Sequence, residues 1–204
     1  SGQYLKAVEQ RAMAESISKV LYPNDNHAEG KMLRLKQQYF LTAASISDIV
    51  RRHLSLYGTL DNFGEKNAIQ INDTHPALAI PELMRVLLDD CGYEWERAWD
   101  IVVRTFAYTN HTVMGEALEK WPLDLMRSVV PEIVDIICRI DQKLKWEHPG
   151  LFIVKDNTAH MANLSIYVGS YINGVAEIHT QILKDDCFKD WYYAFPERFQ
   201  NKTN

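Results

Sequence analysis

The sequence has few cysteines and no long apolar run. Its three cysteines, Cys91, Cys138 and Cys187, lie far apart, and no CxxC pair occurs. An odd number of widely spaced cysteines is typical of free thiols in a reducing compartment, so we expect a cytoplasmic protein. No stretch of about 18 consecutive apolar residues is present, and we therefore expect no membrane span.

An excess of positive charge is also absent. The sequence has 22 lysines and arginines against 27 aspartates and glutamates, a formal net charge of −5. This charge offers no electrostatic basis for binding nucleic acid or an anionic membrane. The composition, 47% hydrophobic and 24% charged, is ordinary for a soluble globular chain, and 204 residues can bury a sizeable core.

Two motifs that identify nucleotide-binding loops and serine hydrolases are missing. Gly169 and Gly174 have the spacing of a phosphate-binding loop, but the required Lys-Ser/Thr does not follow them. No G-x-S-x-G nucleophile elbow occurs either. Candidate chemistry must therefore come from other polar clusters.

Helical periodicity dominates the chain. It is strongest over residues 31–52, where Met32, Leu35, Tyr39, Ala43, Ile46 and Val50 form one apolar stripe. Similar patterns predict further helices, and short apolar runs predict strands between them. The predicted helices cover residues 3–21, from 79 or 81 to 89, 94–106, 131–144 and 171–182, with one more beginning near Pro122. The predicted strands cover residues 67–71, 151–154 and 160–166. Helices alternating with buried strands favour an α/β fold with a parallel sheet, rich in helix.

A polar cluster, Asn72 to Pro76, follows the first predicted strand. Ligands of α/β folds bind at the carboxyl ends of strands. Asp73 and His75 can form hydrogen bonds with the hydroxyl groups of a polar ligand there. The alternative is that Asp73 and Thr74 cap the next helix while His75 is satisfied locally. A metal hydrolase using Asp73 and His75 is a weaker hypothesis, because no third ligand has a recognisable spacing.

Three other polar or charged clusters are candidates for a function or for a purely structural role. Asn110, His111 and Thr112 suit sugar hydroxyls because Asn and His both donate and accept, but they are also ordinary at the end of a helix. Asn24 to Asn26 is typical of a turn. Arg51 and Arg52 lie at the end of the predicted long helix, where the helix dipole favours cations and where a phosphate can also bind.

Several ordered blocks of the sequence resemble the α-glucan phosphorylases, the glycogen, starch and maltodextrin phosphorylases. Residues 72–85, NDTHPALAIPELMR, resemble one family block, and residues 107–113, 116–119 and 121–122 resemble the A-Y-T-N-H-T-V, E-A-L-E and W-P block. Further matches, in the order of the family, are residues 22–26, 29–30, 33–37, 173–176 and 199–204. The resemblance covers nearly the whole chain.

The resemblance implies a fold and an activity. Residues 1–204 would form a single partial domain, the second half of the Rossmann-like N-terminal domain of a GT-B-type glycosyltransferase fold, with the C-terminal cofactor domain absent. The family releases glucose 1-phosphate from α-1,4-glucan ends by phosphorolysis and uses pyridoxal phosphate, whose lysine is not in this sequence, and no metal. The intact enzyme would be a homodimer with residues 4–20 in subunit contacts, and the fragment alone would be inactive.

The resemblance also implies roles for single residues, none of them catalytic. His111 and Asn204, with Val175 alongside, would meet the glucose at the cleaved end, and Asp73 and His75 would line the glucan side of the cleft. Asn26 would lie in a gate loop over the cleft. Arg51 and Arg52 match a pair that binds a regulatory phosphate in animal enzymes, although the stretch after them is short here. The rival interpretation is a carbohydrate-binding or interaction module without catalysis.

Overall fold

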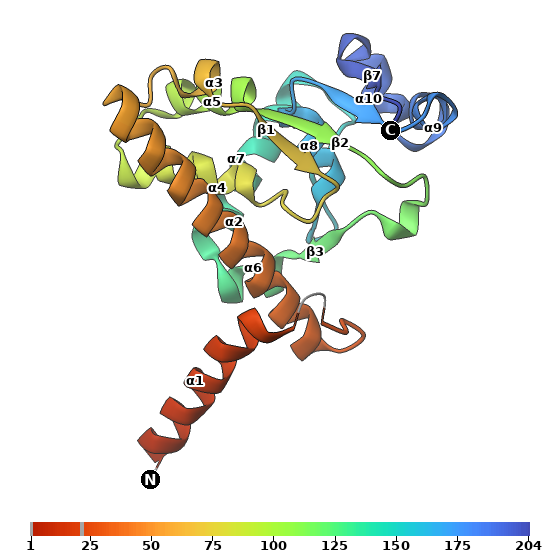
Figure 1. Ribbon diagram of the computed structural model, residues 1–204. Coiled ribbons are helices and arrows are strands. Elements are labelled where there is room, and N and C mark those ends of the chain that lie inside the picture. Colours follow the sequence, from red (N-terminus) through yellow and green to blue (C-terminus); the bar gives the residue numbers. More distant parts are fainter. Residues whose placement is uncertain (1, 21–22) are drawn as a thin grey trace.

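The computed structural model describes residues 2–20 and 23–204, so Leu21 and Tyr22 of the sequence analysis lie outside the described residues (Figure 1). Ten α-helices are present in these residues: α1 (Gly2–Lys19), α2 (Ala28–Tyr57), α3 (Phe63–Lys66), α4 (Ala79–Arg85), α5 (Trp95–Thr105), α6 (Leu123–Val129), α7 (Pro131–Glu147), α8 (Met161–Val168), α9 (Glu177–Ile182) and α10 (Lys189–Ala194). Short π-helical turns, Val86–Asp90 and Leu183–Cys187, extend α4 and α9. None of these helices combines the length and apolar character that crossing a membrane requires.

A parallel sheet of four strands lies in the body of the molecule. Its order is β1 (Ile69–Asn72), β2 (Phe106–Thr109), β6 (Ile172–Gly174) and β7 (Phe199–Asn201). Each strand pairs in parallel with its neighbour, so all four carboxyl ends lie at one edge. A smaller antiparallel sheet joins β3 (Lys120–Pro122), β5 (Thr158–His160) and β4 (Val154–Lys155). The predicted α/β class with a parallel sheet is confirmed.

The two faces of the parallel sheet differ in character. One face is largely buried and contributes Ile71, Phe106, Tyr108, Ile172 and Phe199 to the core, with α8 packed against β2. The other face is polar and partly exposed, and a row of side-chain hydrogen bonds crosses it. The Gln70 amide donates to Thr109 Oγ1 at 2.8 Å, Thr109 Oγ1 donates to Asn173 Oδ1 at 2.8 Å, and Asn173 Nδ2 donates to the Gly174 carbonyl at 2.9 Å.

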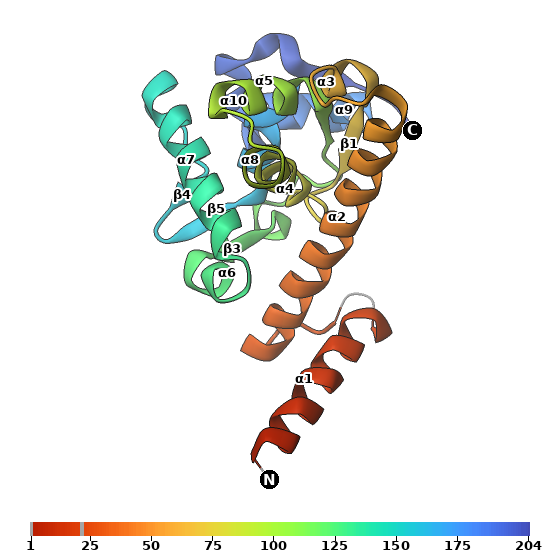
Figure 2. The same cartoon turned by 90° about the vertical axis from the view of Figure 1, so that its left-hand side faces the viewer.

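Helix α1 projects from this body together with the first part of α2 (Figures 1 and 2). The Gln37 amide of α2 donates to the carbonyls of Ile17, at 2.9 Å, and Val20, and so ties the end of α1 to α2. Along α1 the apolar side chains Leu5 and Val8 remain 61% and 46% exposed. The helix predicted over residues 3–21 is therefore present over Gly2–Lys19, with apolar surface open to a partner.

Several of the expectations about local structure are wrong. Of the strand predicted over residues 151–154, only Val154 lies in a strand, β4. Residues 160–166 form the end of β5 and most of α8 rather than a strand, because α8 is buried almost all round and so lacks helical periodicity. Residues 171–182 contain β6 and then α9 instead of one helix. Asn110 to Thr112 follow the strand β2 rather than a helix end. The long helix, predicted to end at Arg52, continues to Tyr57 and ends with Gly58 in the left-handed conformation at φ 70°.

Candidate functional site

The carboxyl edge of the parallel sheet gathers four of the six residues predicted to contact sugar. Asp73 follows β1, His111 follows β2, Val175 follows β6 and Asn204 follows β7. Main-chain bonds continue the sheet into these loops. Asp73 N–H donates to the Thr109 carbonyl at 2.9 Å, Asn110 N–H to the Asn173 carbonyl at 2.9 Å, and Asn204 N–H to the Val175 carbonyl at 3.1 Å. Residues far apart in the sequence therefore share one edge.

The loop after β1 is bent sharply at Asp73. This residue has φ 61°, a left-handed conformation that costs roughly 1–2 kcal/mol for most residues but is tolerated by Asp and Asn. Its Oδ1 accepts the main-chain N–H of Thr74 at 2.6 Å. Helix α4 begins only at Ala79, and its N-terminus has no side-chain cap. The interpretation of Asp73 and Thr74 as caps of the next helix is therefore wrong.

His111 is oriented by a side chain from the neighbouring strand. Its Nε2 lies 2.6 Å from Asn72 Oδ1, the last residue of β1. Both side chains are exposed, so the pair presents neutral hydrogen-bonding groups at the surface of the sheet edge. An imidazole beside an amide is able to match hydroxyl groups without burying a net charge.

Two further residues of this edge, Asn110 and His179, have no role implied by the resemblance, although Asn110 belongs to the polar cluster of residues 110–112. Asn110 is fully buried, and its Nδ2 donates to the hydroxyl of Tyr108 at 3.0 Å. Asn110 Oδ1 accepts Thr112 N–H at 2.9 Å and lies 3.2 Å from Nε2 of His179 on α9. His179 Nδ1 in turn accepts Val175 N–H at 3.0 Å. The only sequence signal was the position of Asn110 within a polar cluster, and His179 had none.

The ends of β6 and β7 are packed closely against α9. Thr180 Oγ1 donates to the Ala176 carbonyl at 2.9 Å and lies 3.1 Å from Oδ1 of Asn201. A side chain in place of Gly174 would bring its Cβ to 2.5 Å from Thr180 Oγ1 and 3.0 Å from His179 Nδ1. This close approach requires glycine at position 174 and fixes Val175 beside Asn204.

Asn26 lies in a turn, as predicted from its sequence, and not in the row of strand ends. Its N–H donates to Asn24 Oδ1 at 3.0 Å. The turn is tied to the segment after His111 through an ion-pair chain, because Arg34 contacts both Asp25, at 2.7 Å, and Glu119, at 2.9 Å. A cavity of about 400 Å³ lies between this turn, the start of α2 and residues 116–122.

Glu119, the last member of these ion pairs, also interacts electrostatically with His75 and Asp73. Burial raises the pKa of the Glu119 carboxyl above its usual value, whereas the amide of Gln38 and the positive charges of Arg34 and His75 oppose the shift and the charge of Asp73 adds to it. The Gln38 amide donates to Glu119 Oε1 at 2.9 Å. His75 is half-buried and, with Arg34 and Gln38, lines a small hollow against α2. It therefore lies between the sheet edge and the Asn26 turn.

Arg51 and Arg52 lie away from the sheet edge on the far half of α2. Both are about three-quarters exposed and both pair with Asp48, at 2.6 Å and 2.8 Å. Their role as a phosphate site stays a prediction. In the described part of the chain, no group of three or more His, Cys, Asp or Glu side chains is arranged to hold a metal ion.

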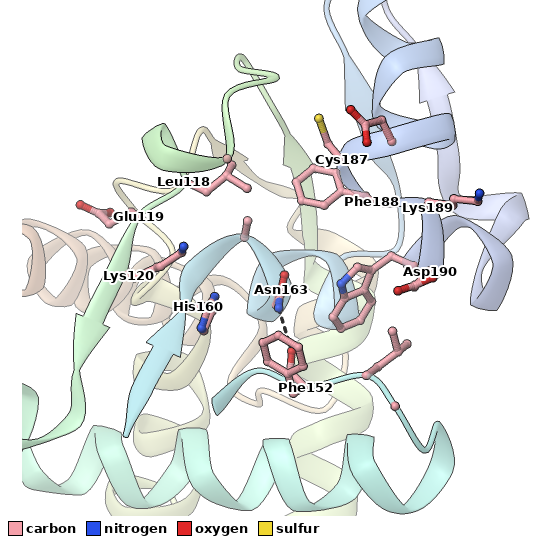
Figure 3. A pocket seen from close by; sticks show the side chains of 16 residues that line it. Leu118, Glu119, Lys120, Phe152, His160, Asn163, Cys187, Phe188, Lys189 and Asp190 are labelled. Carbon is pink, nitrogen blue, oxygen red and sulfur yellow. Dashed lines mark hydrogen bonds between the residues drawn. The ribbon is translucent and has the colours of Figure 1, made fainter. Parts of the chain in front are cut away.

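A separate pocket of about 300 Å³ lies between residues 115–120, the 150–152 loop and residues 186–191 (Figure 3). Figure 3 shows Lys120 and His160 on one side of it and Phe188 on the other, with Glu119 pointing away. Burial, followed by the charge of Lys120, lowers the pKa of His160. The six predicted sugar contacts do not line this pocket, so it is distinct from the strand-end edge.

Comparison with known sequences identifies the family. The sequence profile described as carbohydrate phosphorylase matches residues 1–204. The chain belongs to the carbohydrate phosphorylase family. Similar relatives include "Glycogen phosphorylase, muscle form" from Ovis aries and from Homo sapiens, each 48% identical over 225 aligned residues, and "Glycogen phosphorylase, brain form" from Bos taurus, 45% identical.

This phosphorylase-family chain aligns over its whole length with only part of each relative. Each alignment covers 100% of this chain and 27% of the relative. The chain therefore spans about a quarter of the length of the glycogen phosphorylases it matches. Family membership and similarity over the whole chain confirm the resemblance drawn from residues 72–85 and 107–122.

Proposed function

We propose that this chain is part of an α-glucan phosphorylase that releases glucose 1-phosphate from α-1,4-glucan ends by phosphorolysis. Within it, residues 1–204 would be the second half of the N-terminal domain of a GT-B-type fold and would line the sugar side of the cleft. The observation that carries the proposal is the row of strand ends bearing Asp73, His111, Val175 and Asn204 on one edge of a parallel sheet. Ligands of open α/β sheets bind at such an edge.

The chemistry of the edge suits a terminal glucose unit. A sugar offers hydroxyl groups that both donate and accept, and the His111–Asn72 pair and the amide of Asn204 do the same without net charge. Asp73 and His75 would contact the glucan beyond the cleaved bond, and Asn26 would lie over the opening. His111 would orient the sugar and strengthen its contacts as positive charge develops, without transferring the proton.

The remaining parts of the reaction would come from outside these residues. The resemblance implies pyridoxal phosphate, which is held by a lysine in this family. No lysine within residues 2–20 and 23–204 is buried, so these residues do not fit the attachment of that group. Substrate phosphate would likewise bind elsewhere. The exposed apolar side chains of α1 support subunit contacts in a homodimer, and the free cysteines agree with a cytoplasmic enzyme.

The test compares two proteins with the same substrates. The full-length polypeptide encoded by the gene that carries this sequence should form glucose 1-phosphate from glycogen or maltodextrin and phosphate, and residues 1–204 alone should not. A full-length protein that binds maltodextrin but never forms glucose 1-phosphate would instead establish the rival function, a non-catalytic carbohydrate-binding module. Product formation by residues 1–204 alone would show that the assignment of the chemistry to other parts is wrong.

A further inference from the structure

His179 lies between two of the loops that carry predicted sugar contacts. It is on α9, and its ring reaches back to the end of β6, where Nδ1 accepts the N–H of Val175 at 3.0 Å. The opposite ring nitrogen, Nε2, lies 3.2 Å from Oδ1 of Asn110, at the end of β2. One imidazole therefore spans two strand ends that are 65 residues apart in sequence, Asn110 and Val175.

The hydrogen bonds fix the form of this imidazole. Val175 N–H is always a donor, so Nδ1 must be unprotonated to accept it. The ring hydrogen is then on Nε2, which donates to Asn110 Oδ1. Both ring nitrogens are thus occupied within the protein, and His179 has no ring nitrogen left for a ligand. Its contribution must pass through the residues it holds.

The two residues held by His179 are themselves rigidly placed. Asn110 is fully buried, and its amide also binds the Tyr108 hydroxyl and Thr112 N–H, on either side of His111. On the other side, the close approach of Gly174 to His179 and Thr180 leaves no space for α9 to shift toward β6. A movement of the His179 ring would therefore move the loop of His111 relative to Val175.

We propose that His179 is a positioning residue that aligns His111 with Val175 and Asn204 around one sugar ring. The inference rests on the proposed function and extends it to a residue that touches no substrate. Without the His179–Asn110 bond, the buried Asn110 side chain would still be removed from water but would have lost one partner, which destabilises its position. The 110–112 loop that Asn110 holds would then be free to move. The expected loss in kcat/KM is about tenfold, equivalent to about 1.4 kcal/mol, for a full-length phosphorylase.

Two amide variants separate the two bonds. In His179→Gln the side-chain NH₂ occupies the position of Nε2 and keeps the bond to Asn110, whereas in His179→Asn the side-chain oxygen occupies the position of Nδ1 and keeps the bond to Val175. His53 provides the matched control, because it is a buried histidine whose Nε2 and Nδ1 bind Asn62 and Asn67, both at 2.9 Å, away from the sheet edge. The control variants are His53→Gln and His53→Asn.

The measurements are kcat and KM for phosphorolysis of maltodextrin, the melting temperature, and hydrogen exchange of peptides that contain Thr112, all on the full-length polypeptide. We expect His179→Asn to lose about tenfold in kcat/KM and its Thr112 N–H to exchange faster than in wild type. The kcat/KM of His179→Gln should stay within about threefold of wild type. Both His53 variants should have a lower melting temperature and an unchanged kcat/KM. His179→Ala should be at least as impaired as His179→Asn, and the two amide variants carry the test if His179→Ala does not fold.

Either of two results would overturn the inference. In the first, the wild-type enzyme is active and all His179 variants have the same kcat/KM as the His53 variants. The other is the reverse order, with His179→Asn active and His179→Gln impaired, because alignment would then depend on Val175 alone. Absence of phosphorolysis in the wild-type protein contradicts the proposed function instead, and the exchange rate at Thr112 still tests the contact to Asn110.

Discussion

Two histidine–asparagine networks in this molecule are built alike and lie in different surroundings, one around the buried His53 and one around the partly buried His179. His53 binds Asn62 and Asn67 near the end of α2, and its ring also packs against Tyr57 and Phe63, at 4.6 Å and 5.0 Å between ring centroids. His179 binds Asn110 and Val175 N–H at the carboxyl edge of the parallel sheet. Each ring has one nitrogen that accepts a hydrogen bond and one that lies beside an Asn Oδ1, but only the His179 ring lies at the edge that carries the candidate site.

The largest expected effect is a loss of stability at His53. Replacement by Ala removes the partner of Asn62 Oδ1 and one of the two partners of Asn67 Nδ2, which also donates to the Phe63 carbonyl. Together with the lost ring contacts, this lowers the free energy of unfolding by about 2–4 kcal/mol. Urea unfolding of His53→Ala and wild type measures the difference. A loss of kcat/KM in the full-length His53→Ala enzyme at a temperature where it stays folded would break the comparison.

His111 provides the opposite case, an exposed histidine whose loss should affect activity. Under the proposed function, deleting its side chain would remove one or two hydrogen bonds to sugar, and kcat/KM of the full-length enzyme should then fall roughly ten- to a hundredfold. Stability should change little, because the ring is exposed. The measurement is the pH dependence of kcat/KM for His111→Ala.

The shape of that pH profile decides the role of His111. A contact that only orients the sugar lowers both limbs of the profile alike. Disappearance of one limb together with a loss of a thousandfold or more would identify an acid or base instead. A loss below threefold at every pH would remove His111 from the site altogether.

The smallest expected effect concerns Glu119, which lies between the Asn26 turn and His75. Because burial raises its pKa, the folded state holds the proton more tightly than the unfolded state. The stabilisation from protonated Glu119 is therefore complete below its ordinary pKa of 4.5 and is lost as pH rises through the raised pKa of the folded state. The loss is about 1.4 kcal/mol for each pKa unit by which the folded and unfolded states differ. We expect Glu119→Gln to gain stability relative to wild type over this range.

Glu147 is the matched control for this titration. Although burial works in the opposite direction, hydrogen bonds from Lys143 and Tyr167 lower the pKa of Glu147. Its contribution is therefore lost as pH falls, and Glu147→Gln should lose stability relative to wild type as pH rises. Unfolding measured between pH 4 and 8 compares the two variants. The same sign for both would contradict the assignment of Glu119.

Much of the fold could be predicted from periodicity, and the exceptions have physical reasons. The apolar stripe of α2 predicts a long helix because its other face meets water. Strands β2 and β6 are only four and three residues long and follow or precede helices, so their alternation is too short to detect. Helix α8 is buried almost all round, and a helix without a polar face resembles a buried strand in sequence.

Only some residues of the candidate site could be predicted from the sequence. Asp73 and His75 could be picked out because they directly follow a predicted strand. Val175 and Asn204 came only from the resemblance, since nothing in their local sequence indicates that two strands end there. His179 was missed because its significance lies entirely in contacts with residues from β2 and β6. Such contacts leave no pattern in a single sequence.

The polar row on the open face of the sheet has a direction. Gln70 donates to Thr109, Thr109 donates to Asn173, and Asn173 donates to the Gly174 carbonyl. The first two donors therefore point the same way, from the outer strand β1 toward β6, and the third bond ends the series within β6. Each bond in such a chain polarises the next, so the row acts as one connected series of hydrogen bonds that begins at the Gln70 amide and ends at the Gly174 carbonyl oxygen, which accepts the last hydrogen. Replacing Gln70 would weaken a bond two strands away without touching it.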